Sequence, residues 1–293
     1  MNDAKEVWRT WPLVQREREY SPSSSATSSA SILAEYSAQS REAERTFPCR
    51  KNLRWGDGPD ETFDFFPGTS SHAPLVVFIH GGYWQELSKE ESLFAAPGCV
   101  SNGIAYAAID YTLAPRTNIA RIVEQCRRAV ASLHRQAAVL GYDRQQLYVA
   151  GSSAGAHLAA MLLVRGWHQT QGIPEDAIAG AILLSGVYDL APLVGTYIDG
   201  PLQITAADVA ALSPVGLPHG RPVPVIVAWG EFETGEFKRQ SRDYAERLLA
   251  YGFPVSSFEV AGTNHFDVVF GLTEPTNTLG RATLGLIVGK QPS

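Results

Sequence analysis

The chain has 293 residues, 45% of them hydrophobic and 18% charged, and its 24 basic and 30 acidic side chains give a formal net charge of −6. This length allows one or two domains with a large core, and the acidic balance offers no basic surface for nucleic acid or an anionic membrane. We therefore expect a small-molecule substrate as the partner, with no nucleic acid and no membrane; the oligomeric state stays open, a homodimer included.

The cysteines and the N-terminus bear on the compartment. Cys49, Cys99 and Cys126 are odd in number and far apart, which argues against a disulfide framework and against a metal site. The first residues mix charges and lack the apolar core of a secretory signal, and no apolar run is long enough to span a bilayer. We expect a cytoplasmic protein that binds no metal.

The first 48 residues differ in character from the rest. A polar helical stretch carrying Trp8 and Trp11 leads into the serine-rich segment Tyr20–Ser31. Such serine density favours a loop or the capped start of a following helix. Two interpretations stay open: the segment is a linker, or it is a helical arm that folds back over a pocket and so buries its tryptophans.

Residues 49–293 predict one α/β domain. Lys51–Trp55 and Glu61–Phe66 flank a turn and favour an antiparallel hairpin at a sheet edge. From Pro74 onward, short apolar runs alternate with helical periods, which is typical of βα repeats and a mostly parallel, doubly wound sheet. Residues 189–219 break this alternation and predict a small cap over the site. The expected strands are Leu75–Ile79, Ile104–Ile109, Leu147–Ala150, Ile178–Leu184, Val223–Trp229 and Val255–Val260, and the expected helices are Glu91–Ser101, Ile119–Leu140, Ala154–Arg165 and Glu236–Tyr251.

The clearest candidate for chemistry is a serine in a five-residue turn. Residues 151–155 read Gly-Ser-Ser-Ala-Gly, between an apolar run and a helix-like run. This is the context of a nucleophile elbow, in which small residues flank a serine at a tight turn from strand to helix. In open α/β sheets the ligand binds beyond the carboxyl ends of the strands, where this turn falls. Ser153 is therefore the candidate nucleophile.

An activated serine needs a base, and the base needs an acid that orients it. His265 lies in the loop after the last expected strand and is the candidate base. Glu231, Glu233 and Glu236 follow the preceding strand and compete as the acid. Glu233 is preferred because a carboxylate at the loop tip can reach back to the imidazole. The other histidines have other expected roles: His157 in packing, and His72, His134, His168 and His219 in solvent.

A third element would stabilise the anion that forms on attack. Residues 80–84 read His-Gly-Gly-Tyr-Trp and directly follow the first strand of the parallel series. Glycines let the main chain approach a substrate carbonyl, and segments of this type supply backbone N–H groups to an oxyanion hole together with the amide after the nucleophile. We assign the donors as the amides of Gly82, Tyr83 and Ala154.

Four segments together resemble the α/β-hydrolase type of kynurenine formamidase, also called arylformamidase. They are His80–Gln85, Gly151–His157, Glu236–Ser241 and Asn264–Asp267, and the likeness extends from about Tyr20 to Val269. The His-Gly-Gly and Gly-x-Ser-x-Gly elements are also similar to the hormone-sensitive-lipase-like esterases. Those families usually carry aspartate where this chain has Glu233; the fold accepts either acid, so the departure bears on the substrate and not on catalysis.

The resemblance implies an α/β-hydrolase fold and hydrolysis of N-formyl-L-kynurenine, or of a related aryl formamide, through a Ser-His-Glu triad and an acyl-enzyme. No metal or organic cofactor is needed. An aryl leaving group suits aromatic walls, for which the candidates are Tyr83, Trp84, Tyr188, Tyr197 and Phe266. The alternatives are a broad-range carboxylesterase acting on short-acyl or aryl esters, and a non-catalytic binding module, against which the presence of all three triad residues counts.

Overall fold

The computed structural model describes residues 7–25 and 29–289 and contains an eight-stranded sheet. The strand order is β1-β2-β4-β3-β5-β6-β7-β8; β2 pairs antiparallel with both β1 and β4, and the other neighbours are parallel. The strands are β1 (Arg50–Arg54), β2 (Thr62–Phe66), β3 (Leu75–Ile79), β4 (Ala105–Ile109), β5 (Leu147–Ser152), β6 (Gly180–Leu184), β7 (Val225–Gly230) and β8 (Val255–Val260). The predicted mostly parallel sheet with an N-terminal antiparallel hairpin is confirmed.

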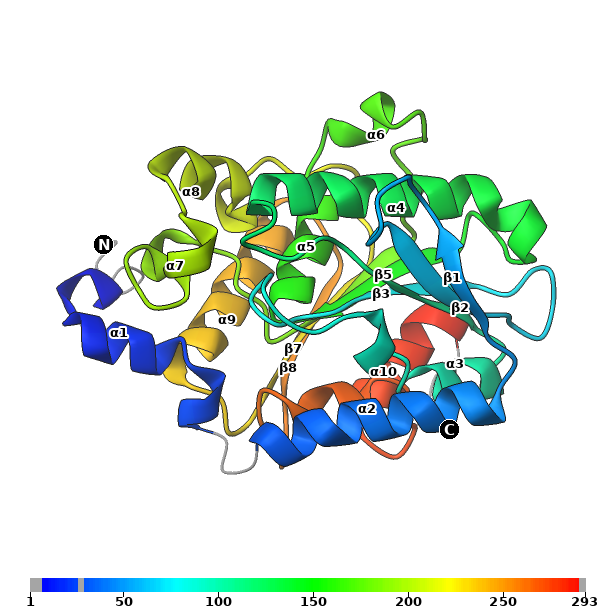
Figure 1. The fold of residues 1–293 in the computed structure, drawn as a ribbon, viewed down its shortest axis with the longest axis horizontal. Coiled ribbons are helices and arrows are strands. Elements are labelled where there is room, and N and C mark those ends of the chain that lie inside the picture. Colours follow the sequence, from blue (N-terminus) through cyan, green and yellow to red (C-terminus); the bar gives the residue numbers. More distant parts are fainter. Residues whose placement is uncertain (1–6, 26–28, 290–293) are drawn as a thin grey trace.

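Helices cover both faces of the sheet (Figure 1). One face packs against α4 (Ile119–Leu140), α5 (Ala154–Leu162) and α9 (Gly235–Ala250), and the other against α2 (Ser29–Thr46), α3 (Ala96–Ser101) and α10 (Thr278–Val288). The shorter helices are α1 (Leu13–Glu19), α6 (Trp167–Thr170), α7 (Asp199–Leu202) and α8 (Ala206–Leu212). Single 3-10 turns are η1 (Val7–Thr10), η2 (Pro22–Ser24), η3 (Lys89–Glu91), η4 (Ala191–Leu193), η5 (Pro214–Gly216) and η6 (Asp267–Gly271).

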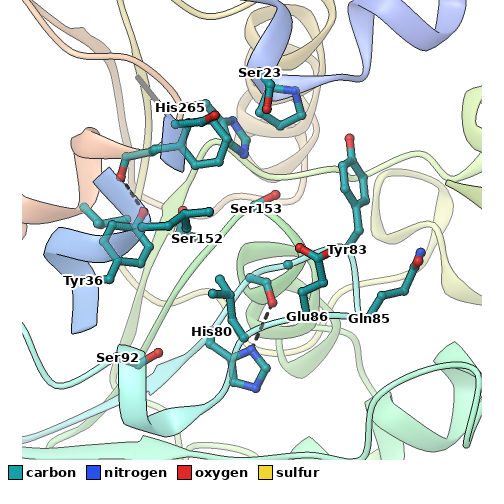
Figure 2. A pocket seen from close by; sticks show the side chains of 18 of the residues that line it. Ser23, Tyr36, His80, Tyr83, Gln85, Glu86, Ser92, Ser152, Ser153 and His265 are labelled. Atoms are coloured by element: carbon teal, nitrogen blue, oxygen red, sulfur yellow. Dashed lines mark hydrogen bonds between the residues drawn. The ribbon is translucent and has the colours of Figure 1, made fainter. Parts of the chain in front are cut away.

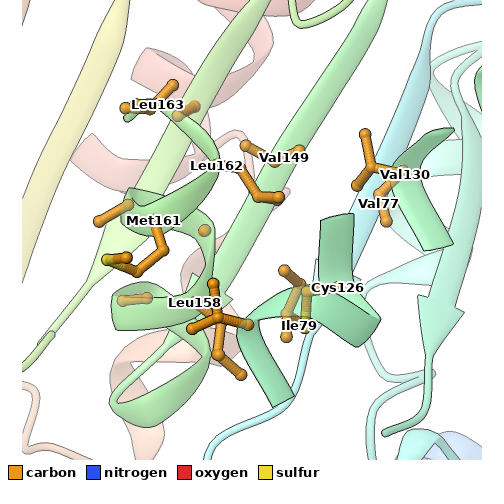
Figure 3. Close-up of a cluster of buried hydrophobic side chains, with 14 of the residues drawn as sticks. Val77, Ile79, Cys126, Val130, Val149, Leu158, Met161, Leu162 and Leu163 are labelled. Carbon is orange, nitrogen blue, oxygen red and sulfur yellow. The ribbon is translucent and has the colours of Figure 1, made fainter. Parts of the chain in front are cut away.

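Strand β3 shows why the sheet needs cover on both sides. Its sequence Leu-Val-Val-Phe-Ile is buried throughout. Because successive side chains of a strand point to opposite faces, Val77 and Ile79 join the core beneath α4 and α5, whereas Val76 and Phe78 join the core beside α2 and α10. Figure 3 shows the first of these cores, in which Val77 and Ile79 cluster with Leu158 of α5. Apolar packing on this face therefore supports the helix that follows Ser153.

One expected helix, Glu91–Ser101, is not continuous. The chain forms the short turn η3 and then α3, which begins at Ala96. Pro97 lies in the first turn of α3, where its missing N–H costs nothing, but the same residue would break a helix that had started a turn earlier.

Three histidines expected in solvent are buried instead: His134, His168 and His219. His168 stacks on Trp167 with ring centroids 4.0 Å apart, and a ring nitrogen of His219 lies 2.8 Å from the hydroxyl of Tyr244. Burial lowers the pKa of all three imidazoles. The aromatic partner of His168 is its immediate neighbour, whereas that of His219 lies 25 positions along the chain. His72 is exposed, as expected.

Between β6 and β7, residues 189–219 carry the short helices η4, α7, α8 and η5. Of these, η4 contacts α1 of the N-terminal segment, α8 packs against α4, and η5 packs against α5 and α9 (Figure 1). Over the described residues, no helix is both long and apolar enough to cross a membrane, and no His, Cys, Asp and Glu side chains gather as a metal site. The cysteines are free thiols. Residues 1–6, the start of the segment predicted not to be a secretory signal, and residues 26–28 of the serine-rich segment lie outside the described residues.

Candidate active site

A cavity of about 250 Å³ opens beyond the carboxyl ends of β3 and β5. Its walls combine the loop after β3, the turn after β5, the loop after β8 and two segments of the N-terminal region. The lining residues are Ser21, Pro22, Ser23, Ser29, Leu33, Tyr36, Phe78, His80, Gly81, Gly82, Tyr83, Gln85, Glu86, Leu87, Ser92, Phe94, Ser152, Ser153, Tyr197, Ile198, His265, Phe266 and Val269. Figure 2 shows Ser153 near the centre of this cavity, with His265 on one side and His80 on the other.

Ser153 occupies a strained turn between β5 and α5. Its φ of 56° and ψ of −119° lie in a region that residues with a side chain rarely adopt. The flanking glycines make the turn possible: a Cβ on Gly155 would lie 2.0 Å from the carbonyl oxygen of Ile79, and one on Gly151 would lie 2.3 Å from that of Gly155. The close approach of α5 to β3 thus fixes the serine at the bottom of the cavity.

Glu233 and His265 come from neighbouring loops, after β7 and β8, and contact each other. His265 Nδ1 lies 3.1 Å from Glu233 Oε2, and the carboxylate side chain is completely buried. The other oxygen, Oε1, accepts hydrogen bonds from Ser185 Oγ and from the amide of Gly230, each at 2.5 Å. With Nδ1 donating to a carboxylate, Nε2 of the imidazole is the nitrogen available to accept a proton.

The two competing carboxylates have other partners. Glu231 accepts from the amide of Gly262 at 2.8 Å and is exposed. Glu236 forms two hydrogen bonds with the guanidinium of Arg239, at 2.7 and 2.8 Å. Of these three described residues, Glu233 is the one that contacts His265.

The loop that carries His265 is held by its own polar ends. Asn264 donates from its backbone N–H to Asp267 Oδ1 at 2.6 Å and from its side chain to Asp267 Oδ2 at 2.7 Å. Across the loop, the His265 ring packs against Phe237 of α9 with centroids 4.3 Å apart. The imidazole is therefore restrained by a turn, a ring contact and a carboxylate.

The loop after β3 turns sharply at Gly82, Tyr83 and Trp84, whose φ values are 90°, 48° and 61°. A Cβ on Gly82 would lie 2.2 Å from the carbonyl oxygen of Glu86, so the turn requires glycine there. The predicted donors lie in this loop and at the start of α5. Among the described residues, no protein acceptor receives a hydrogen bond from the amides of Gly82, Tyr83 or Ala154. Gly82 and Tyr83 line the cavity, and Ala154 directly follows Ser153, so their assignment as oxyanion donors stays a prediction.

His80 supports this loop from behind and was not among the predicted site residues. Its ring stacks on Tyr111 with centroids 4.1 Å apart and planes 7° from parallel. The Tyr111 hydroxyl donates to the carbonyl oxygens of His80 and Gly81, at 3.0 and 3.2 Å. His80 Nε2 lies 3.4 Å from Asp110. In the sequence, a histidine followed by two glycines identifies this loop. It does not predict which contacts the histidine ring makes.

Of the five aromatic residues predicted as substrate walls, Tyr83, Tyr197 and Phe266 line the cavity. Trp84 and Tyr188 do not line it, and both are fully buried. The Trp84 indole packs edge-on against His157, and Tyr188 stacks on Tyr244. In their place, the apolar wall is built by residues that sequence reasoning missed: Leu33, Tyr36, Phe78, Phe94 and Val269.

The N-terminal segment folds back along the cavity. Tyr20 is fully buried. Its hydroxyl donates a hydrogen bond to Glu236 Oε2 at 2.6 Å and accepts one from Gln240 Nε2 at 2.8 Å. Burial, together with the Glu236 carboxylate, raises the pKa of this phenol well above its usual range. The Tyr83 hydroxyl donates to the carbonyl oxygen of Tyr20 at 2.5 Å. Beyond Tyr20, Ser21, Pro22 and Ser23 contribute to the cavity wall. Of the first 48 residues, those near Tyr20 and the first turns of α2 thus form an N-terminal arm that contributes one wall of the cavity.

Comparison with known proteins gives a consistent result. A family model described as BD-FAE matches residues 65–180. The chain is 35% identical to a protein of Salmo salar named kynurenine formamidase, with 91% of this chain and 94% of that protein covered. It is 36% identical to the protein of the same name from Danio rerio, with 96% of this chain and 98% of that protein covered.

Solved structures agree on the fold. One from Silicibacter sp. TM1040 superposes with a TM-score of 0.80 at 26% identity, over 92% of this chain and 97% of that chain. An esterase from the archaeon Pyrobaculum calidifontis superposes with a TM-score of 0.69 at 17% identity, over 98% of both chains. The expected α/β-hydrolase fold is confirmed.

Proposed function

Because the chain belongs to the kynurenine formamidase family and is a hydrolase of the α/β-hydrolase type, we propose that it cleaves N-formyl-L-kynurenine to kynurenine and formate. Ser153, His265 and Glu233 form the proposed triad. The observation that carries this proposal is the likeness to proteins of that name over more than nine tenths of both chains. The contact between His265 and Glu233 at 3.1 Å supports it.

In the first half-reaction, Ser153 Oγ attacks the formyl carbon while His265 Nε2 takes the serine proton. Negative charge develops on the formyl oxygen, and the amides of Gly82, Tyr83 and Ala154 donate hydrogen bonds to it. Glu233 keeps Nδ1 protonated and stabilises the imidazolium that forms. The C–N bond then breaks, and His265 returns the proton to the arylamine nitrogen, which leaves as kynurenine.

In the second half-reaction, water replaces the arylamine. His265 Nε2 takes a proton from water, the hydroxide attacks the carbon of the formyl-serine, and the same amides hold the oxyanion. The bond between Ser153 Oγ and the formyl carbon breaks, and Oγ recovers the proton from His265. Formate leaves. No metal or organic cofactor takes part in either half.

The decisive test is a substitution of the proposed nucleophile, Ser153. In purified protein, Ser153→Ala should lower kcat for N-formyl-L-kynurenine by at least about 10³-fold, leaving the residual rate that binding and the oxyanion donors provide. The control is Ser88→Ala, because Ser88 lies outside the cavity and its hydroxyl bonds with Glu91. Unchanged hydrolysis by Ser153→Ala would assign the nucleophile elsewhere.

A carboxylesterase is the second candidate, because the serine, the base and the free amides serve an ester equally well and several similar folds are esterases. The two functions are distinguished by the ratio of kcat/KM for N-formyl-L-kynurenine to kcat/KM for an aryl acetate of similar size. A ratio above one supports the formamidase, and a ratio well below one supports the esterase.

We further propose a cytoplasmic location. The cysteines of this chain are free thiols, as a reducing compartment maintains them. Recovery of the activity with the soluble cytoplasmic fraction of the source cells, and not with a secreted fraction, is the expected result.

A further inference from the structure

One carboxylate of the cavity has no part in the mechanism above. Glu86 follows the loop of residues 80–84, and its backbone N–H donates to the carbonyl oxygen of Gly82 at 3.0 Å. The Glu86 carbonyl oxygen is the atom that a Cβ on Gly82 would meet. The main chain of Glu86 is therefore fixed relative to the amides of Gly82 and Tyr83.

The Glu86 side chain lies in the cavity beside Tyr83, on the same side of Ser153 as Gln85 and across the cavity from Tyr36 (Figure 2). Gln85 is anchored by a hydrogen bond from Nε2 to the carbonyl oxygen of Ile198, at 2.9 Å. Glu86 is exposed to solvent and lines the same cavity as Ser153, and the residue before it is tied to the segment between β6 and β7.

No cation compensates this carboxylate within the described part of the chain. Its side chain forms neither a salt bridge nor a hydrogen bond there, whereas Glu233 and Glu236 each have several partners. Among the described residues that line the cavity, Glu86 is the single acidic one, and lysine and arginine are absent. In the free protein, solvent alone therefore compensates the negative charge that Glu86 brings to the cavity.

We propose that Glu86 is a specificity-determining residue that selects substrates bearing a protonated amine over neutral or anionic substrates of the same shape. An ammonium group donates charge-assisted hydrogen bonds to a carboxylate, and a second carboxylate near Glu86 is repelled. Resting on the proposed function, this assigns Glu86 to the α-ammonium group of N-formyl-L-kynurenine, whose amino-acid side chain is ortho to the formamide. The substrate carboxylate then faces away from Glu86.

The test compares substrates that differ in that amine. They are N-formyl-L-kynurenine, its des-amino analogue 4-(2-formamidophenyl)-4-oxobutanoate, and neutral 2′-formamidoacetophenone. In Glu86→Gln, the ratio of kcat/KM for the amine-bearing substrate to that for the des-amino analogue should fall about fivefold or more, mainly through KM. The wild-type ratio should also fall as salt is raised. In Glu86→Lys, the des-amino anion should become the preferred substrate.

Glu90→Gln is the matched control, because it removes the same charge from an exposed residue four positions along that does not line the cavity. It should leave the ratio at the wild-type value. An unchanged ratio in Glu86→Gln, or an equal loss on all three substrates, overturns the proposal.

A second substrate pair tests the role of Glu86 independently of the proposed formamidase function. If the wild-type protein hydrolyses no formamide, the formamidase proposal fails, and Glu86 is tested on 4-(2-aminoethyl)phenyl acetate against 4-ethylphenyl acetate. A fall of the amine-to-neutral ratio in Glu86→Gln then supports selection by Glu86 on an esterase. No fall on this pair overturns it.

Discussion

His265 Nδ1 lies 3.1 Å from Glu233 Oε2, and the same carboxylate is held at Oε1 by Ser185 Oγ and by the amide of Gly230. Both oxygens are therefore engaged, and the buried carboxylate is unable to rotate away from the imidazole. This relationship fixes the tautomer of His265 and places the loop-tip glutamate where the proposed triad needs its acid.

Glu233→Gln should lower kcat by about 10³- to 10⁴-fold. The amide offers one acceptor oxygen where the carboxylate offers two, so either Nδ1 of His265 or the Ser185 and Gly230 donors lose their acceptor. Steady-state hydrolysis of 4-nitrophenyl acetate measures the effect. Glu231→Gln changes an exposed neighbour in the same loop and should leave kcat within a factor of two or so of the wild type. A Glu233→Gln enzyme with wild-type kcat would mean that another residue orients the base.

Gly155→Ala should destabilise the protein by about 1–3 kcal/mol and abolish most activity. The new Cβ would lie 2.0 Å from the Ile79 carbonyl oxygen and 2.6 Å from that of His80, and both are main-chain atoms that move only with the strand end and the loop. Thermal unfolding and kcat measure the two effects. Gly200→Ala adds the same methyl group where nothing lies within 4 Å, and it should keep the wild-type Tm or raise it slightly. A Gly155→Ala protein of wild-type Tm and kcat would contradict the packing argument.

Much of the site could be predicted because it is local to strand ends. Ser153, His265 and the loop of residues 80–84 each follow an apolar run, and parallel strands that share a sheet bring their carboxyl ends to one edge. The acid was harder to choose, because three glutamates lie within six residues. The three glutamates differ in their hydrogen-bond partners, which come from elsewhere in the chain, such as Ser185 for Glu233.

The cavity walls could not be predicted in the same way. Tyr83 and Trp84 are adjacent in the sequence, yet one lines the cavity and the other lies in the core, because consecutive left-handed residues set their directions. No propensity predicts such a turn.

The N-terminal arm was equally hard to predict. Its polar composition favours a linker, and the contact that anchors it joins Tyr20 to Glu236, 216 positions apart. Of the two tryptophans in this segment, Trp8 is buried and Trp11 is half-buried, and neither lines the cavity.

The stability of the fold should depend on the protonation of His157. This imidazole is fully buried in α5, a ring nitrogen lies 2.7 Å from the carbonyl oxygen of Leu212, and burial lowers its pKa from 6.5 to about 4. Between these two values the unfolded chain binds a proton that the folded chain does not. Falling pH therefore favours unfolding in this window, and above about pH 6.5 the effect vanishes.

His157→Gln keeps an amide that can donate to Leu212 and removes the titration. Between pH 7 and pH 5, the free energy of unfolding of the wild type should fall by about 2 kcal/mol more than that of His157→Gln. Urea unfolding at the two pH values measures the difference. His72→Gln, at an exposed position, should follow the wild type. Parallel pH profiles for the wild type and His157→Gln would show that His157 does not carry this dependence.

Tyr20→Phe should weaken the arm and so raise KM while leaving kcat less affected. The missing hydroxyl breaks the hydrogen bonds to Glu236 and from Gln240 that hold the arm on α9, and a buried Glu236 oxygen loses a donor, at a cost of about 1–3 kcal/mol. Because Ser21, Pro22 and Ser23 follow directly and line the cavity, a loosened arm exposes the bound substrate to water. KM for N-formyl-L-kynurenine and the rate of proteolytic cleavage near residue 20 should therefore rise together.

Tyr251→Phe is the control, because it removes one hydrogen bond at the far end of α9. It should change neither KM nor the cleavage rate. A Tyr20→Phe enzyme that loses stability while keeping the wild-type KM and cleavage rate would show that this contact braces α9 and does not hold the arm over the site.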